Sequence, residues 1–233
     1  MTDKAVVVTG ASQGLGFCLV NEGIKRGYTV YALDIKINNR LTMLNGCDNH
    51  VCDVTDYDSV QKCRKLIEKK TPSVDILFKN AGIWLDNKRL TLDNPEFDFD
   101  IIFRQFDVNA AGVLRVFREF LPLINKSQTK SVINISSEAG SIGDCRRKCE
   151  YGYCMSKAAQ NMATKIMQNA YPQIKFHSIH PGWMITPQGM MGTDGNLKPT
   201  QNPADTAEKL YDMAENPNTK YLYCDFEGNK LNF

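Results

Sequence analysis

The sequence predicts an α/β fold in which a doubly wound, mostly parallel seven-stranded sheet carries helices on both faces. Strand-like runs alternate with helical patterns from one end of the chain to the other. The early strands are continuous apolar runs rather than alternating ones, as expected when both faces of a parallel sheet are covered. No repeat, low-complexity tract or linker interrupts the pattern, so we expect residues 1–233 to form a single domain.

The expected strands are residues 5–10, 28–34, 50–54, 74–82, 130–137, 175–182 and 221–228. After the third strand, Asp56 or Ser59 can begin a helix that ends near Pro72. A long helical segment follows from Glu96 to Leu121, and we expect Pro122 to end it because proline lacks the N–H that continues a helix. Such sheets bind ligands at the carboxyl ends of their strands, so the substrate pocket is expected in the loops there.

A glycine-rich turn follows the first strand. In TGASQGLG, residues 9–16, Gly10, Gly14 and Gly16 lie where a strand passes into a helix. The backbone can therefore turn tightly, approach a pyrophosphate and direct the helix N-terminus at its charge. The three glycines are also compatible with a simple tight strand-to-helix loop. Asp34 ends the second strand, where its carboxylate can accept hydrogen bonds from the adenosine ribose hydroxyls or remain a solvated strand-end residue.

The carboxylate of Asp34 predicts NAD as the cofactor rather than NADP. It would face the 2′-phosphate of NADP, and two unit charges about 4 Å apart repel by about 4 kcal/mol at an effective dielectric of about 20. TGASQGLG contains no arginine or lysine to offset that repulsion. Lys36 lies two residues beyond Asp34, however, and could turn toward a phosphate.

Two tyrosines are each followed by a lysine four residues later, and the sequence around them distinguishes the two pairs. Pro172 interrupts the pair of Tyr171 and Lys175, so those residues are expected at a helix exit and on the next strand. The segment from residue 153 to 170 has no proline or glycine and repeats apolar residues at helical spacing. That spacing places Tyr153 and Lys157 on one helix face.

Tyr153 and Lys157 together suggest acid–base chemistry. The ordinary pKa of a tyrosine is about 10, so the side chain exchanges protons poorly at neutral pH until a nearby cation favours its phenolate. Lys157 would supply that cation, so that Tyr153 could take a proton from an alcohol or return it to a carbonyl. The alternative is an amphipathic helix whose tyrosine hydroxyl reaches solvent and whose lysine is an ordinary surface charge.

The motifs occur in the order seen in short-chain dehydrogenases/reductases, and the chain resembles that family over practically its whole length. The resemblance rests on TGASQGLG, Asp53, Asn80-Ala81-Gly82, Asn109, Ser136-Ser137, Tyr153 with Lys157, and Pro181-Gly182. It implies a Rossmann fold, an NAD(P) cofactor and a catalytic group formed by Asn109, Ser137, Tyr153 and Lys157. PGW at residues 181–183 and the ending DFEGNKLNF are similar to the carbonyl-reductase-like branch.

The resemblance also implies the residues that bind the dinucleotide. They are Gly10, Ser12, Gln13, Gly14, Leu15, Gly16, Asp34, Asp53, Val54, Asn80, Ala81, Gly82, Tyr153, Lys157, Pro181, Gly182 and Thr186. By the same resemblance, Asp53 lies beside the adenine, Asn80 and Gly82 near the adenosine ribose, and Thr186 at the nicotinamide amide.

The resemblance further implies roles near the reacting carbon. Ser137 would hydrogen-bond the reacting oxygen and Lys157 the nicotinamide ribose. Asn109 would orient a water toward Lys157, or it would mark only a local helix irregularity. Ser136 should point to the opposite side of its extended segment and serve in packing or in a backbone hydrogen bond.

The chain departs from the family pattern in two places. Lys79 stands where the family usually has the first of two asparagines, which puts the local strand hydrogen bonding in doubt rather than catalysis. The interval from Ser137 to Tyr153 is longer than usual, so a small insertion is expected at the pocket rim. The segment of about 183–200 is interpreted as a substrate loop that could close over an apolar carbonyl compound. Met190 and Met191 could instead fill gaps in the core.

Composition excludes several other classes of protein. The formal charge of +2 gives no field that would attract nucleic acid or an anionic membrane, and no stretch approaches the roughly 20 apolar residues of a membrane span. The eight cysteines contain no CxxC and are interpreted as reduced thiols, with Cys52, Cys63 and Cys154 buried. The three histidines show no metal spacing, so no metal site is predicted. The first ten residues lack the pattern of a signal peptide, so a cytoplasmic location is expected.

The leading hypothesis is an oxidoreductase that uses NAD, with NADP as the lesser alternative, and that acts on a small carbonyl or alcohol compound. A catalytically silent dinucleotide-sensing regulator is the second hypothesis, although a sensor has no chemical need for all four catalytic residues. A nucleic-acid-binding protein on the same scaffold is disfavoured because no basic surface is concentrated in the sequence. The family resemblance implies a homodimer or homotetramer that assembles through helices near residues 100–120 and 153–170.

Overall fold

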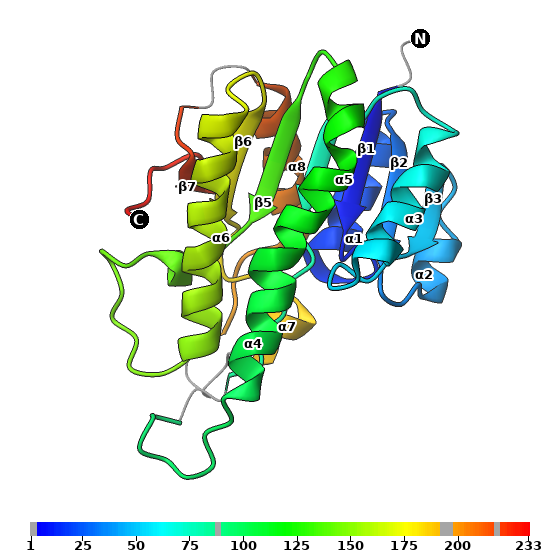
Figure 1. The fold of residues 1–233 in the computed structure, drawn as a ribbon. Coiled ribbons are helices and arrows are strands. Elements are labelled where there is room, and N and C mark those ends of the chain that lie inside the picture. The colour runs from blue at the N-terminus through cyan, green and yellow to red at the C-terminus, as the bar shows by residue number, and fades with distance from the viewer. Residues whose placement is uncertain (1–3, 87–89, 192–197, 217–219) are drawn as a thin grey trace.

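The computed structural model describes residues 4–86, 90–191, 198–216 and 220–233. Its strands are β1 (Ala5–Thr9), β2 (Thr29–Asp34), β3 (Cys47–Val51), β4 (Ile76–Lys79), β5 (Ser131–Ile135), β6 (Lys175–His180) and β7 (Tyr223–Asp225). They form one seven-stranded sheet in the order β3-β2-β1-β4-β5-β6-β7, in which every pairing is parallel (Figure 1). The order reverses direction at β1, which confirms the predicted doubly wound Rossmann fold.

Helices cover both faces of this sheet. They are α1 (Gly14–Lys25), α2 (Asn39–Thr42), α3 (Tyr57–Glu68), α4 (Asp100–Phe106), α5 (Gly112–Lys126), α6 (Tyr151–Ala170), α7 (Pro187–Met191) and α8 (Pro203–Glu215). A π-helical turn, Asp107–Ala111, joins α4 to α5, and a short 3₁₀ turn, Glu138–Gly140, follows β5. Figure 1 shows α5 and α6 in front of the sheet and α1 and α8 behind it.

Two apolar cores explain why the central strands are continuous apolar runs in the sequence. Along β1, Val7 packs with α3, α5 and α6, whereas Val6 and Val8 pack with α1 and α8. All three side chains are fully buried. Since neighbouring residues of a strand face opposite sides, both sides of β1 have to be apolar.

The third strand differs from its prediction. It spans Cys47–Val51 rather than residues 50–54, and its pairing with β2 sets Val30 opposite Cys47 and Asp34 opposite Val51. Because β3 is an edge strand, its residues are half-buried or exposed, and its sequence is polar. A continuous apolar run is therefore not a reliable sign of this strand, and its predicted position was wrong.

The predicted end of the long helix at Pro122 was also wrong. The helical segment begins at Asp100, passes through the π-helical turn and continues through Pro122 to Lys126. Proline removes the bond to the carbonyl four residues earlier, which belongs to Arg118. Arg118 and Pro122 are both on the exposed side of α5, so water can satisfy that carbonyl.

Several smaller predictions can be compared directly. Asp56 caps α3, as one of the two expected starting residues, by accepting a hydrogen bond from the N–H of Asp58. All eight cysteines are free; Cys52 and Cys63 are buried, whereas Cys154 is only half-buried. No helix in the described part of the chain combines the length and the apolar character needed to cross a bilayer.

Candidate active site

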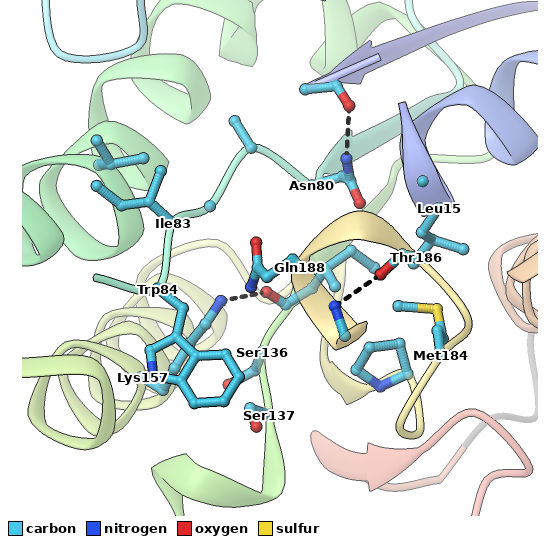
Figure 2. A pocket seen from close by; sticks show the side chains of 18 of the residues that line it. Leu15, Asn80, Ile83, Trp84, Ser136, Ser137, Lys157, Met184, Thr186 and Gln188 are labelled. Atoms are coloured by element: carbon cyan, nitrogen blue, oxygen red, sulfur yellow. Dashed lines mark hydrogen bonds between the residues drawn. The ribbon is translucent and has the colours of Figure 1, made fainter. Parts of the chain in front are cut away.

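A cavity of about 620 Å³ opens at the carboxyl ends of β1, β2, β4, β5 and β6, beside α6 and α7. All of the residues predicted for the site line it except Ser12, Gly16 and Asn109. Figure 2 shows Trp84, Lys157, Ser136 and Ser137 on one side of this cavity, with Leu15, Met184 and Thr186 on the other. The topology therefore gathers residues that lie more than a hundred positions apart in the sequence.

The glycine turn has the close backbone approaches that exclude other side chains. Gly10 and Gly14 have φ angles of +65° and +54°. A Cβ on Gly10 would lie 2.8 Å from the Cα of Ala81, and one on Gly16 would lie 2.0 Å from the carbonyl oxygen of Gly10. The side chain of Gln13, the N-cap residue of α1, makes no capping hydrogen bond. The positive end of α1 is thus not neutralised by a side-chain cap, as an anion site requires.

Asp34 supports this turn with both carboxylate oxygens. Its Oδ2 accepts a hydrogen bond of 2.8 Å from the N–H of Ser12, and its Oδ1 accepts one of 3.2 Å from the N–H of Lys36. Asn38 donates to the carbonyl oxygen of Ser12 at 2.6 Å. Ser12 thus acts behind the turn rather than at the cavity surface. A carboxylate can accept about four hydrogen bonds, so Asp34 retains capacity for ligand hydroxyls.

Other predicted residues hold the cavity walls in place. The side-chain amide of Asn80 donates to the carbonyl oxygens of Thr9 and Gly10 at 3.0 and 2.9 Å, which ties the end of β4 to the glycine turn. Asp53 accepts hydrogen bonds from the N–H and the hydroxyl of Thr55 at 2.8 and 2.7 Å. The Thr186 hydroxyl accepts a bond of 3.1 Å from the N–H of Gly189, which fixes the start of α7 (Figure 2).

The expected substrate loop is partly described. Met184, Pro187, Gln188 and Gly189 line the cavity, next to Pro181, Gly182 and Trp183. Met190 and Met191 are 47% and 68% exposed, so they do not fill the core. Residues 192–197 of this loop lie outside the part of the chain that the structure describes.

Tyr153 and Lys157 share one face of α6 and both line the cavity. The Lys157 Nζ lies 5.7 Å from the centre of the Tyr153 ring. It donates hydrogen bonds to the carbonyl oxygen of Ile135 at 2.8 Å and to the Gln160 side chain at 3.1 Å. Tyr171 and Lys175 lie at the end of α6 and at the start of β6, which confirms the sequence-based distinction between the two pairs.

Burial dominates the acid–base properties of this pair. It lowers the pKa of Lys157, a residue only 4% exposed, to about 7. It also raises the pKa of Tyr153, against the lowering contributions of a hydrogen bond from the Ser137 side chain and of the charge of Arg147. The sequence led us to expect Lys157 to lower the pKa of Tyr153. In the structure the ammonium group is instead directed at Ile135 and Gln160, and desolvation prevails.

The two serines after β5 have different surroundings. The Ser137 hydroxyl donates to Glu138 at 2.9 Å and accepts from the N–H of Ala139 at 3.1 Å, and it lies close enough to the phenol of Tyr153 to lower its pKa. The Ser136 hydroxyl donates to the buried side chain of Asn161 at 2.7 Å. Ser137 is thus the serine next to Tyr153, and Ser136 has the packing role expected of it.

Asn109 lies in the π-helical turn, so the helix irregularity considered from the sequence is present. Its side chain accepts a bond of 2.8 Å from the N–H of Ile83 and donates one of 2.9 Å to the carbonyl oxygen of the same residue. It also donates to the Ser156 hydroxyl at 3.0 Å. Asn109 is 1% exposed and therefore acts from behind the cavity wall by fixing the backbone of Ile83.

Sequence reasoning missed a group of residues that position Tyr153. The Trp84 ring packs against the Tyr153 ring, with centroids 5.5 Å apart. The two oxygens of Asp86 accept bonds of 3.0 and 2.8 Å from the N–H groups of Gly152 and Tyr153, in the first turn of α6. Gln105, which is fully buried, donates to Asp86 at 2.8 Å. Nothing in the local sequence pairs a loop at residues 84–86 with a helix that begins more than sixty residues later.

The cavity also contains charged residues that were not predicted. Glu138 and Arg147 line it close to Ser137 and Tyr153. Within the described ranges, no cluster of three or more His, Cys, Asp or Glu side chains is placed to hold a metal ion. The arrangement therefore offers a phenol, a hydroxyl and an ammonium group beside a turn suited to an anion.

Comparison with known proteins connects this arrangement to one family. The family model described as short chain dehydrogenase matches residues 4–195. An uncharacterised oxidoreductase of Schizosaccharomyces pombe is 31% identical over 194 residues, which are 79% of this chain and 75% of that protein. The oxidoreductase UcpA of Salmonella typhimurium is 30% identical over 223 residues, covering 92% and 80% of the two chains. An NADPH-bound carbonyl reductase from chicken fatty liver superposes with a TM-score of 0.84 at 25% identity, and each chain is covered completely.

Proposed function

Because this chain belongs to the short-chain dehydrogenase family, we propose that it uses a nicotinamide dinucleotide to interconvert a secondary alcohol and a ketone, or a primary alcohol and an aldehyde. The observation that carries this proposal is the placement of Tyr153, Lys157 and Ser137 around one cavity that the glycine turn also lines. No single one of these features would suffice, because folds of this type host many functions.

The residues present fit a dinucleotide. The close approaches at Gly10 and Gly16 leave a bare backbone surface, and the uncapped start of α1 favours a pyrophosphate there. Asp34, Asp53, Thr186 and Lys157 also line the cavity. In this proposal Asp34 and Asp53 would hold the adenosine, and Thr186 and Lys157 the nicotinamide and its ribose. When bound, the dinucleotide supplies or accepts the hydride.

The chain's own residues handle the proton and the developing charge. The Tyr153 hydroxyl gives its proton to the carbonyl oxygen during reduction and takes one from the alcohol during oxidation. The Ser137 hydroxyl hydrogen-bonds the same oxygen and stabilises its charge. Lys157 holds the cofactor ribose from the same helix face, and Trp84 and Asp86 fix the orientation of the phenol.

The raised pKa of Tyr153 gives the two directions different pH profiles. Burial keeps the phenol protonated at neutral pH, and this is the form that donates a proton to a carbonyl. Tyr153 should therefore not make carbonyl reduction depend on pH from about 6 to 8, and any change in that range should come from Lys157, whose pKa is about 7. Alcohol oxidation should rise with pH over the same range, because it needs the phenolate.

We further propose that the cofactor is NAD(H) rather than NADP(H). The carboxylate of Asp34 is fixed at the cavity by the N–H groups of Ser12 and Lys36, so it cannot swing away from a 2′-phosphate without breaking two hydrogen bonds. Its charge would repel that phosphate by an amount on the order of a few kcal/mol. Because the chain is similar to an NADPH-bound reductase, the affinities for NADH and NADPH have to be compared directly.

The test is a titration with NADH and NADPH, followed by turnover measurements on a panel of aldehydes, ketones and quinones. We expect Tyr153→Phe to lose nearly all turnover while it keeps its affinity for the dinucleotide. Tyr171→Phe is the matched control, because that tyrosine is also followed by a lysine four residues later but packs against Phe117 away from the cavity. The control should retain activity. A protein that binds NADH yet stays inert across the panel would instead be the silent regulator.

A further inference from the structure

The loop between the 3₁₀ turn and α6, residues 141–150, brings one arginine to the cavity. Arg147 lines it together with Ser137 and Tyr153, and its side chain is 30% exposed. This loop lies in the long interval between the two catalytic positions, which the sequence indicated as an insertion. Arg146, the preceding residue, is exposed, and its guanidinium hydrogen-bonds the carbonyl oxygen of Cys145.

Two carboxylates fix the position of the Arg147 guanidinium. Its Nη2 donates to Glu138 at 2.5 Å, and its Nη1 donates to Glu150. Glu150 is only 4% exposed, and its second oxygen is buried without a hydrogen-bond partner among the described residues. Arg147 is thus the cation that compensates a nearly buried carboxylate, which gives it a definite place on the cavity rim.

Glu138 connects this arginine to the catalytic hydroxyls. One of its oxygens takes the bond from Arg147, and the other accepts the hydrogen of the Ser137 hydroxyl at 2.9 Å. Ser137 in turn lines the cavity with Tyr153 and lowers the pKa of its phenol. A continuous chain of contacts therefore runs from the loop to the proton donor.

The charge on Glu138 decides how strongly its carboxylate holds the hydrogen of the Ser137 hydroxyl. Ser137 can donate to a substrate oxygen only by releasing Glu138, and a carboxylate with full charge is a strong acceptor. The ion pair with Arg147 takes up part of that charge and weakens the competition. The same charge acts on Tyr153, because a neighbouring anion disfavours the phenolate and a neighbouring cation favours it.

The ionisable groups around the phenol come from four parts of the chain. Glu138 follows β5, Arg147 belongs to the loop, and Cys154 and Lys157 lie on α6. Asp86 reaches the first turn of α6 from the loop after β4, where it accepts the N–H of Tyr153. Glu138 and Cys154 oppose ionisation of the phenol, whereas Arg147 promotes it from the open side of the cavity.

We propose that Arg147, through its ion pair with Glu138, is a positioning residue of the active site that frees the Ser137 hydroxyl for the reacting oxygen and offsets the negative charge beside Tyr153. This inference rests on the proposed oxidoreductase function and goes beyond it, because it makes the loop of residues 141–150 part of the active site. Without Arg147, Glu138 would keep the Ser137 hydrogen and would disfavour the phenolate.

The experiment compares five proteins: the wild type, Arg147→Gln, Arg147→Lys, Arg146→Gln and the double variant Arg147→Gln with Glu138→Gln. We expect Arg147→Gln to lower the kcat of carbonyl reduction about tenfold or more, with an unchanged Kd for the dinucleotide measured by NADH fluorescence. In the pH profile of alcohol oxidation, the rise in rate should shift to a higher pH by about one unit in Arg147→Gln. A neighbouring charge shifts a pKa by roughly 1–3 at buried sites and by less at a half-exposed one. Arg146→Gln should match the wild type.

The double variant separates this role from a merely structural one. If Arg147 acts by compensating Glu138, removing the carboxylate charge should restore kcat to within about threefold of the wild type. The pH at which alcohol oxidation rises should also return to its wild-type value. If Arg147 only holds the loop through Glu150, the double variant should remain as slow as Arg147→Gln, and the inference is overturned. Arg147→Lys keeps the charge and should retain most of the activity even if the glutamine variant folds poorly. A wild-type protein that neither binds NADH nor turns over would remove the proposed function and this inference with it.

Discussion

Lys79 carries its ammonium group into the apolar core, where few partners are available. It is 2% exposed, its Nζ lies 3.4 Å from the carbonyl oxygen of Val113 and 3.8 Å from the Met167 sulfur, and the Phe117 ring centre is 5.2 Å away. Burial holds its pKa well below the ordinary value. The departure from the family pattern noted in the sequence is therefore a buried lysine without a counterion at these contacts.

We expect Lys79→Met to raise the free energy of unfolding at pH 7, by an amount on the order of 1–4 kcal/mol, because an apolar side chain replaces a poorly compensated cation. Since the pKa is lower in the folded state, the destabilisation by Lys79 is greatest below that folded-state pKa. It declines as the pH rises toward the ordinary value. The advantage of the variant should therefore shrink from pH 7 to pH 10 in urea titrations. Lys65→Met, on the exposed side of α3, is the control and should change little.

At the scale of one carboxylate, the proposed preference for NAD(H) depends on Asp34. Asp34→Asn removes the charge but keeps an oxygen that can accept the N–H of Ser12. We expect the ratio of kcat/KM for NADH over NADPH to fall by about tenfold or more in this variant. Asp48→Asn, on the neighbouring strand and paired with Lys70 rather than facing the cavity, should leave the ratio unchanged. A wild-type preference for NADPH, or an unaltered ratio in Asp34→Asn, would show that Asp34 does not contact the ribose.

At the scale of elements, α6 depends on a cap that comes from a distant loop. Its N-cap residue, Glu150, has a φ of +67° and makes no side-chain capping bond, so Asp86 satisfies the first N–H groups instead. Gly152 allows this approach, because a Cβ there would lie 2.3 Å from the Gln105 side chain. The helix that carries Tyr153 and Lys157 is thus positioned by the loop that carries Trp84.

We expect Asp86→Ala to lower the free energy of unfolding by about 0.5–2 kcal/mol, the usual effect of losing a cap. Turnover should fall further than stability alone would explain, because Tyr153 loses its fixed orientation. Chemical denaturation and kcat under saturating substrate measure the two effects. Asp98→Ala is the control, since Asp98 is exposed and accepts the local N–H of Asp100 just before α4. Equal kcat for Asp86→Ala and the wild type would contradict the positioning role.

At the scale of the whole molecule, one side of α6 presents apolar side chains to solvent. Met155, Met162 and Ile166 follow one another at intervals of seven and four residues, and they are 49%, 62% and 59% exposed. Phe103 on α4, the helix packed against α6, is 71% exposed. Exposed apolar stripes of this kind are typical of contact surfaces, and we propose that assembly uses these helices.

We therefore expect a homodimer or homotetramer in light scattering coupled to gel filtration. Met162→Glu should shift the protein to smaller species, because it places a charge in the proposed contact. Met43→Glu is the matched control, since Met43 is 81% exposed beside α2, far from α6 in the sheet order. A wild-type protein that runs as a monomer would refute the expectation.

The sequence by itself determined the α/β class, the parallel sheet, the glycine turn and the placement of Tyr153 and Lys157 on one face of α6. Local rules sufficed for these features: buried strands have to be apolar on both faces, turns with positive φ need glycine, and residues four apart share a helix face. The same rules misplaced β3 and the end of α5, because an edge strand need not be apolar and a proline on an exposed helix face can be tolerated.

Only the tertiary structure decided which distant side chains meet. The cap from Asp86, the packing of Trp84 on Tyr153, and the contacts of Arg147, Glu138 and Ser137 depend on the path of loops whose sequence carries no periodic signal. The acid–base properties of Tyr153 and Lys157 were likewise set by desolvation, which arises only when the chain closes around them. Periodicity and motif spacing record local geometry, whereas burial and long-range contacts are properties of the folded whole.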